Sequence, residues 1–190
     1  MNSALSFAIQ AAWISLGLVW AIAALTVKRT VRKEPLDQRI GHLATFAVAF
    51  LLLFSGAVRI GALAWQVIPQ SEISGAVGLL VTLGGAAFAT WARLYLGGNW
   101  SSVVAIKEHH TLIRTGPYTI VRHPIYAGLL LAMLGTAIAK GGAAAFLAIF
   151  VAFAGWQAKM RREESFLLVQ FGETYLRYRR EVKALVPFVM

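Results

Sequence analysis

Long apolar runs alternate with short polar or charged segments along this chain. Five runs stand out, at residues 4–27, 43–65, 75–96, 125–139 and 143–158. The first holds no charged residue and, at about 1.5 Å per residue in a helix, can cross a hydrocarbon layer of about 30 Å. The pattern predicts an all-α fold, an integral membrane bundle of about five transmembrane helices followed by a helical C-terminal segment.

The composition supports a membrane class and removes others. Hydrophobic residues make up 58% of the chain before its 17 glycines are counted, and charged residues only 14%, against about 25% charged in ordinary soluble domains. Disorder is excluded because it requires low hydrophobicity and high charge. The chain has no cysteine, which excludes disulfides, thiolate metal sites and cysteine nucleophiles.

The positions of the basic residues orient the predicted bundle. Residues 28–39 carry five Lys or Arg and residues 159–190 carry seven, whereas residues 66–74 carry none. The positive-inside rule therefore predicts that 28–39, 97–123 and 159–190 are cytoplasmic, with the N-terminus outside, in an inner membrane. Topology and anionic lipid account for the net charge of +10, so the bilayer is the expected partner and nucleic acid is not.

A short turn predicts which distant residues meet. Lys140-Gly141-Gly142 leaves room only for an antiparallel helical hairpin, at about 124–158. His123 lies about 18 residues before this turn and Glu163 about 22 residues after it. If helix continues past residue 158, the two lie within about 6 Å of the same depth.

Polar chemistry therefore gathers at one membrane surface. His123, at the start of a helix opened by Pro124, shares a face with Tyr126, and the acidic and basic residues 161–164 lie at the same depth. Such a cluster at the edge of an apolar bundle is a candidate ligand site. Interfacial charges, belt tyrosines and a helix cap are the alternative interpretation. No phosphate-binding glycine loop is present. No metal site is expected, because the side chains of the adjacent residues His109 and His110 point apart.

Two segments together resemble a known family. They read GPYTIVRHPIYAG at residues 116–128 and RREESFLLVQFGETYLRYRREV at residues 161–182. The combination is similar to the isoprenylcysteine carboxyl methyltransferase family, within the wider group of phospholipid N-methyltransferases. The resemblance covers about residues 96–187. The apolar runs predict a first part, 1–96, of three transmembrane helices. The resemblance implies that the second part, 97–190, which contains the hairpin and the cytoplasmic segment, binds the cofactor.

The resemblance also implies a chemistry and a set of residues. It implies S-adenosylmethionine as cofactor and the carboxylate of an isoprenylated cysteine, or an analogue, as methyl acceptor. The implied cofactor residues are His110, Thr111, Leu112, Ile113, Tyr118, His123, Pro124, Ile125, Tyr126 and Glu163. Lys159 occupies the position of a substrate-side arginine in the family, and Lys159 or Arg162 would hold the acceptor carboxylate. Such a carboxylate is already ionised at neutral pH and needs no general base.

Other interpretations stay open at this point. A phospholipid amine is the nearest alternative acceptor, and an NADPH-dependent sterol-type reductase or a non-enzymatic membrane scaffold are further alternatives. Arg59, inside the second run, indicates either a polar cavity or a side chain that reaches the interface. A set of small residues in the third run predicts close helix packing: Gly78, Gly84, Gly85, Ala86 and Ala89.

Overall fold

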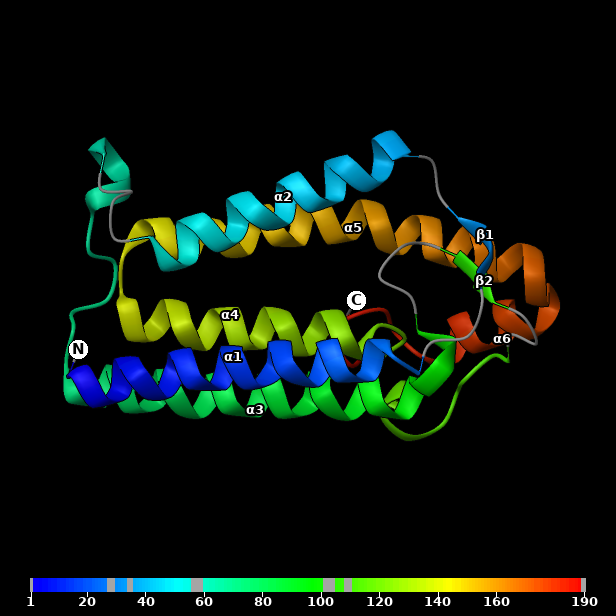
Figure 1. Ribbon diagram of the computed structural model, residues 1–190, viewed down its shortest axis with the longest axis horizontal. Coiled ribbons are helices and arrows are strands. Elements are labelled where there is room, and N and C mark those ends of the chain that lie inside the picture. Colours follow the sequence, from blue (N-terminus) through cyan, green and yellow to red (C-terminus); the bar gives the residue numbers. More distant parts are fainter. Residues whose placement is uncertain are drawn as a thin grey trace.

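The computed structural model describes residues 2–26, 30–33, 36–55, 60–100, 105–107 and 111–188, and it is dominated by helices that run along one axis (Figure 1). The long helices are α1 (Ser3–Ala24), α2 (Leu36–Phe54), α3 (Glu72–Leu96), α4 (Pro124–Lys140) and α5 (Ala143–Phe171). A short α6 (Glu173–Glu181) follows. Three single-turn 3₁₀ helices are η1 (Gly61–Ala64), η2 (Gly97–Asn99) and η3 (Gly116–Thr119).

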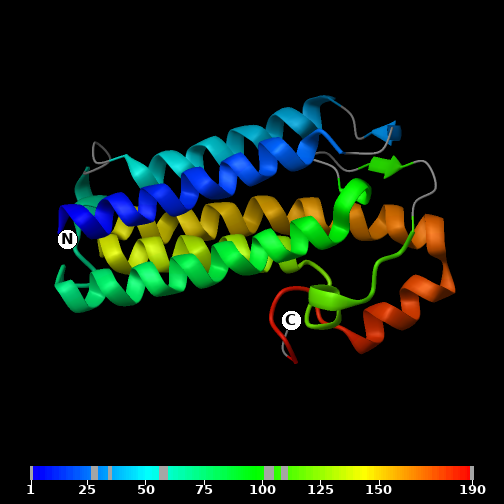
Figure 2. The same ribbon diagram turned by 60° about the horizontal axis from the view of Figure 1, so that its bottom comes forward.

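The bundle is built from two helix pairs. The antiparallel helices α3 and α4 pack closely from Gly78 beside Ala139 to Ala89 beside Gly128. Helix α2 packs along α5, and α4 contacts α5 between the pairs. Helix α1 lies against α3 (Figures 1 and 2). The apolar core between the pairs centres on Met133, Ala148 and Trp156.

Length and hydropathy show a multi-pass membrane protein. Among the described residues, three helices are long and apolar enough to cross a membrane: Ser3–Ala24, Glu72–Asn99 and Ala143–Phe171. Two shorter apolar helices, Ile40–Phe54 and Pro124–Lys140, lie beside them in the bundle. The count of five spans and the cytoplasmic position of the C-terminus stay predictions.

The second helix differs from its predicted span. The apolar run reaches residue 65, but α2 ends at Phe54 and a separate turn, η1, follows. A helix end leaves carbonyl groups without partners, and here the Lys140 ammonium donates a hydrogen bond to the Phe54 carbonyl at 3.1 Å. Arg59, whose role was left open, lies outside the described residues.

Small residues let α3 and α4 approach closely. A Cβ at Gly78 would lie 2.5 Å from the Gly135 carbonyl oxygen, so no larger residue fits there. Gly85 and Ala89 are likewise buried against α4, which confirms the packing interpretation for these positions. It is wrong for Gly84, which faces outward with open space beside it, because one helical step rotates it away from α4.

The two ends of the bundle gather different loops. At one end β1 (Thr30–Lys33) pairs antiparallel with β2 (Ala105–Lys107), a small sheet that the apolar pattern did not predict. At the other end Gly141 ends α4 with φ of 71°, and a β-bridge joins Gln66 to Gly142. The described strands from the basic segments 28–39 and 97–123 therefore share one end, and the segment from residue 66 shares the other with the hairpin turn.

Candidate functional site at the basic end of the bundle

The start of α4 is held by the C-terminal segment. Pro124 occupies the first helical turn and His123 is the N-cap residue, although its side chain makes no capping hydrogen bond. The His123 backbone N–H instead donates to the Ala184 carbonyl at 2.9 Å, and that of Arg122 donates to the Lys183 carbonyl at 2.8 Å. The chain after α6 thus returns to α4 and fixes the place where the His123 side chain begins.

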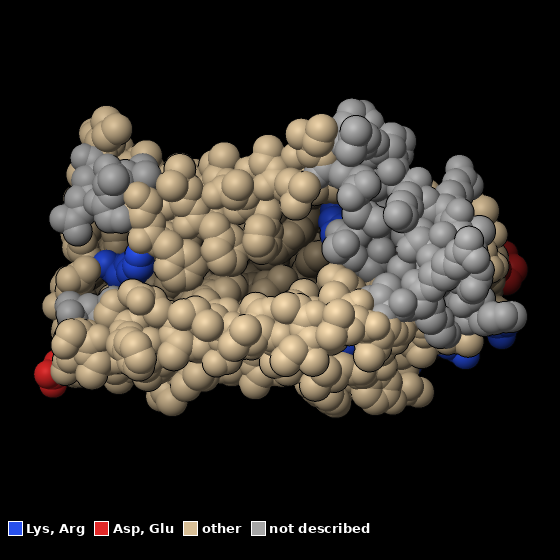
Figure 3. Space-filling model, in the orientation of Figure 1, with Lys and Arg blue, Asp and Glu red and all other residues tan. Residues whose placement is uncertain are grey.

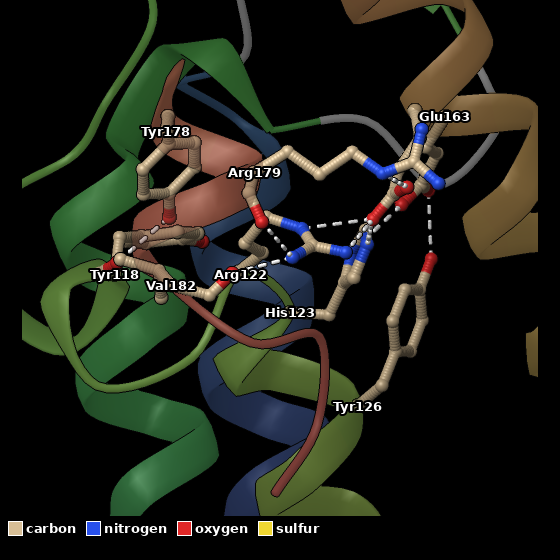
Figure 4. Close-up of polar contacts among 9 residues, drawn as sticks. Tyr118, Arg122, His123, Tyr126, Glu163, Tyr178, Arg179 and Val182 are labelled. Atoms are coloured by element: carbon tan, nitrogen blue, oxygen red, sulfur yellow. Dashed lines mark hydrogen bonds and ion pairs between the residues drawn. The ribbon is translucent and has the colours of Figure 1, made fainter. Parts of the chain in front are cut away.

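Glu164 joins three segments of the protein. Its Oε1 accepts hydrogen bonds from Arg122 Nε at 3.0 Å and Nη2 at 2.8 Å, and lies 3.1 Å from His123 Nε2. Its Oε2 lies 3.6 Å from Arg179 Nε on α6. Because an ionised carboxylate only accepts hydrogen bonds, His123 Nε2 acts as a donor here. Figure 4 shows Arg122 and His123, at the start of α4, pointing toward the same place as Arg179 of α6.

Glu163 faces a different neighbour from Glu164. Its Oε1 accepts a hydrogen bond from the Tyr126 hydroxyl at 2.7 Å, and its Oε2 lies 3.7 Å from His123 Nδ1 (Figure 4). The His123 ring therefore lies between two carboxylates. The side chain of Glu163 is 25% exposed, against 15% for Glu164. Glu163 is thus the acidic group of the pair with more room for an additional ligand.

Aromatic rings and a cation border this carboxylate. The Tyr126 ring lies 5.8 Å from the His123 ring and 5.6 Å from that of Trp156, measured between centroids. The Lys159 ammonium, one helical turn before Glu163 on α5, is 5.8 Å from the Tyr126 ring centroid. Tyr126 is therefore bordered by a cation, an acid and an aromatic ring.

Two buried tyrosines support the same end of the bundle. The Tyr178 hydroxyl on α6 donates to the Tyr118 carbonyl at 2.7 Å, and the Tyr118 hydroxyl donates to the Ala92 carbonyl at 3.4 Å. Burial is the largest cause that raises the pKa of both tyrosines. Both hydroxyls stay protonated at neutral pH and act as donors that tie α6 to η3 and η3 to α3.

The structure brings some of the predicted site residues together and separates others. His123, Tyr126, Lys159 and Glu163 surround one point. Arg162 is turned toward α2, where its Nη1 lies 3.0 Å from His42 Nε2.

The segment before η3 makes its described contacts elsewhere. Thr111 accepts a hydrogen bond from Asn99 at 3.0 Å, Leu112 and Ile113 are half-buried, and His110 lies outside the described residues. Pro124 is buried and Ile125 half-buried in the first turn of α4.

Sequence reasoning missed the roles of Arg122, Glu164 and Arg179. In the sequence, Arg122 is only one of the basic residues of segment 97–123, and Glu164 is only one member of the charged cluster at residues 161–164. A signal existed, because the basic pair Arg122-His123 and the acid pair Glu163-Glu164 lie at matching depths on the two arms of the hairpin. Two adjacent basic residues and two adjacent acidic residues at the same depth indicate ion pairs across the interface between the two helices.

The fold and this site define a membrane-embedded helical protein with a polar cluster at one end, and its relatives are consistent with that class. A family model described as phospholipid methyltransferase matches residues 73–174, more than half of the chain. The chain belongs to this family.

Individual relatives refine the comparison. Protein-S-isoprenylcysteine O-methyltransferase of Xenopus laevis is 30% identical over 116 residues, which are 60% of this chain and 40% of that protein. Cobalt-zinc-cadmium resistance protein CzcN of Cupriavidus metallidurans is 34% identical over 116 residues, 57% of this chain and 50% of that protein. The matched regions span about half the length of these two relatives or less.

A solved structure is also similar. That of the eukaryotic intramembrane Ras methyltransferase ICMT matches with a TM-score of 0.51 and 27% sequence identity, over 84% of this chain and 55% of that one. These similarities confirm the resemblance inferred from residues 116–128 and 161–182.

Proposed function

We propose that this protein is an S-adenosylmethionine-dependent methyltransferase whose acceptor is the carboxylate of a membrane-embedded isoprenylated cysteine or an analogue. One observation carries the proposal. Tyr126 and Glu163, 37 positions apart, meet at 2.7 Å beside Lys159, where the apolar part of the bundle ends. The similarity to isoprenylcysteine methyltransferases supports this choice. The basic end of the bundle would then face the cytoplasm.

The residues around Glu163 fit the proposed cofactor. When bound, S-adenosylmethionine supplies a methyl group on a positively charged sulfonium, which an acceptor oxygen attacks in line. Glu163 is partly exposed and keeps acceptor capacity on Oε2, so it would accept hydrogen bonds from the polar groups of the cofactor. The Tyr126 ring offers an aromatic face, which attracts a cation. The remaining residues assigned by resemblance would complete the cradle: His110, Thr111, Leu112, Ile113, Tyr118, His123, Pro124 and Ile125.

The basic residues of α5 would hold the acceptor. An ionised carboxylate needs no general base, so the protein has only to orient it and exclude water, which lowers the barrier substantially. Lys159 lies over Tyr126 and would place a carboxylate beside the cofactor site. Arg162 contacts His42, and its guanidinium has further donors for the same anion.

An aromatic row leads from this site into the membrane-spanning part. Trp156 follows Tyr126 at 5.6 Å, Phe46 follows at 6.0 Å, and Phe50 follows at 4.5 Å, each measured between ring centroids. Figure 3 shows that the surface is hollowed between α1 and α2 on this side. An isoprenoid chain would lie along this row and enter sideways from the bilayer, which explains why such an enzyme is embedded in a membrane.

A phospholipid amine is the second candidate acceptor, because the matching family model is described as phospholipid methyltransferase. An amine must lose a proton when it is methylated, and the described groups nearest to the site that accept a proton are Glu163 and His123. The two candidates therefore differ in their need for these groups as a base.

The test uses the full chain in lipid nanodiscs. Methyl transfer from labelled S-adenosylmethionine is measured to a farnesylcysteine analogue and to phosphatidylethanolamine, and binding of S-adenosylmethionine and of NADPH is measured by calorimetry. We expect S-adenosylmethionine to bind and the farnesylcysteine analogue to be methylated. Glu163→Gln and His123→Ala should weaken cofactor binding without unfolding the protein, whereas Glu173→Gln, an exposed acid on α6, should not. Binding of NADPH alone, or of neither compound, overturns the proposal.

A further inference from the structure

A polar cavity lies at the end of the bundle opposite to the methyl-transfer site. It measures about 380 Å³ and is lined by residues from three helices: Ser6, Ile9 and Gln10 of α1, Phe54 of α2, and Thr136 and Lys140 of α4. Ligand sites commonly occupy about 300–1,000 Å³ and combine apolar walls with a few polar groups. Four of these six residues are polar or charged, although the helices that supply them are otherwise strongly apolar.

Lys140 is the cation of this cavity. Its ammonium donates one hydrogen bond, to the Phe54 carbonyl, and lies 5.4 Å from the Phe54 ring centroid. An ammonium has three donors, so it has capacity for another acceptor. No carboxylate pairs with Lys140 among the ion pairs of the described residues. The cavity is therefore complementary to an anion.

Two of the other polar side chains that line the cavity also have hydrogen-bonding groups available for a ligand. In the part of the chain that the structure describes, the side chains of Ser6 and Gln10 make no hydrogen bond, and both line the cavity. Gln10 is exposed and Ser6 half-buried, so both side chains are available to a ligand that enters the cavity. The Thr136 hydroxyl is already engaged, since it accepts a hydrogen bond from Trp13 at 2.9 Å and donates to the Ala132 carbonyl at 3.0 Å. The free donors thus belong to Lys140, Gln10 and Ser6.

Depth and wall chemistry identify the ligand class. Lys140 is the last residue of α4, Phe54 is the last of α2, and Ser6 lies in the first turn of α1. All three therefore lie at the same end of the bundle, which is the end expected to face the lipid headgroups of the leaflet opposite to the proposed methyl-transfer site. Ile9 and Phe54 provide apolar walls, and the surface is hollowed between α1 and α2 (Figure 3). A phosphate that carries an apolar chain matches both the polar donors and the apolar walls of the cavity. A free phosphate matches only the polar donors.

We propose that this cavity binds the phosphate headgroup of an anionic phospholipid from the leaflet opposite to the proposed methyl-transfer site. The Lys140 ammonium and the Gln10 amide would donate to the phosphate, and the acyl chains would pass Ile9 and Phe54 and leave the cavity sideways into the bilayer. This site shares none of the residues assigned to the methyl-transfer site, so it holds or fails independently of the proposed function.

The test counts lipids retained by the full chain. The protein is reconstituted in phosphatidylcholine containing a minor fraction of phosphatidylglycerol, and retained lipids are identified by native mass spectrometry. We expect a preference for phosphatidylglycerol that falls about tenfold in Lys140→Gln, a change equivalent to about 1.4 kcal/mol. It should persist in Lys140→Arg and in Arg177→Gln, which removes an exposed cation of α6.

Gln10→Glu keeps the proposal testable if Lys140→Gln does not fold. This change preserves side-chain size and leaves the bond from Lys140 to Phe54 in place, but it adds a negative charge to the cavity. It should abolish the preference for phosphatidylglycerol while thermal unfolding stays unchanged. An unchanged preference in Gln10→Glu overturns the proposal. The proposal is also overturned if inorganic phosphate alone stabilises the wild type against thermal unfolding as much as phosphatidylglycerol does. That result would assign the cavity to a small anion.

Discussion

The hydroxyl of Tyr126 donates a hydrogen bond to Glu163 at 2.7 Å, and this contact joins the first turn of α4 to α5 beyond its apolar part. The Tyr126 ring also lies 5.6 Å from the ring of Trp156, the next aromatic residue toward the core. A single side chain therefore orients the proposed cofactor acid and begins the aromatic row that would receive the acceptor.

Removing this hydroxyl should weaken cofactor binding more than folding. In Tyr126→Phe the ring contacts persist, but Glu163 loses a donor, and hydrogen bonds to charged groups contribute about 1.5–3 kcal/mol. We expect the affinity for S-adenosylmethionine to fall about tenfold, measured by calorimetry, with a small drop in thermal stability. Tyr95→Phe is the matched control, because the Tyr95 hydroxyl donates to Thr115 in an exposed place. Equal effects of the two changes would contradict this role.

Neutralising Glu164 should chiefly destabilise the fold. Its carboxylate is bonded to Arg122, whose side chain is only 9% exposed, and to His123. Breaking such a buried pair on one side commonly costs about 3–5 kcal/mol, because the other charge is left uncompensated. Glu164→Gln should therefore lower the unfolding temperature in detergent markedly.

The double variant Glu164→Gln with Arg122→Gln tests the reason for that loss. It should recover part of the stability, because no buried charge is left without a partner. Glu173→Gln, exposed on α6, should leave the unfolding temperature unchanged. A double variant no more stable than Glu164→Gln alone would argue against an ion pair as the source of the effect.

The contact between α3 and α4 should tolerate no side chain at its small positions. A Cβ at Gly78 would collide with the backbone of Gly135 and with Ala139. Gly78→Val should therefore separate the helices. The loss of stability should reach or exceed the range of about 1–3 kcal/mol that is typical of overpacking. Gly84→Val on the same helix meets open space and should be nearly neutral. Thermal unfolding of the two variants in one detergent compares them directly, and similar losses would refute the close packing.

Counting residues from the hairpin turn predicted well how far along the helices the site residues lie. It predicted poorly which way their side chains face. The rise of about 1.5 Å per residue placed His123 and Glu163 at one level from the Gly141 turn alone, and the contacts of His123 with both acids agree with that level. Successive helical residues differ by about 100° around the axis. Whether Glu163 or Glu164 meets Arg122 therefore depends on how α5 is rotated against α4, which packing along the whole interface determines.

The remaining differences have similar causes. The apolar run through residue 65 gave no sign that α2 ends at Phe54, because that end is satisfied by Lys140, which is distant in the sequence. The β1–β2 pair likewise joins two loops far apart in the chain, and neither segment shows an apolar pattern of its own. Long-range pairing of polar groups was thus the part of the fold that local patterns could not predict.

Lys159 should determine the affinity for a carboxylate acceptor. Its ammonium lies 5.8 Å from the Tyr126 ring centroid, next to the proposed cofactor site, and a carboxylate placed there would gain a charge-assisted contact. Lys159→Gln should raise KM for a farnesylcysteine analogue about tenfold, with a smaller change in kcat, because the contact is present before the methyl moves and throughout the transfer.

The charge and the acceptor can be varied separately to check this role. Lys159→Arg should restore most of the affinity, because it keeps the cation at the position where the related methyltransferases are expected to carry arginine. Lys183→Gln, which removes an exposed cation near the same end, should leave KM unchanged. An analogue with an amide in place of the carboxylate should bind the wild type and Lys159→Gln equally, since it carries no charge for Lys159 to meet. If Lys159→Gln instead lowers kcat alone, or weakens binding of the amide analogue equally, Lys159 positions the helix or the cofactor and does not contact the acceptor.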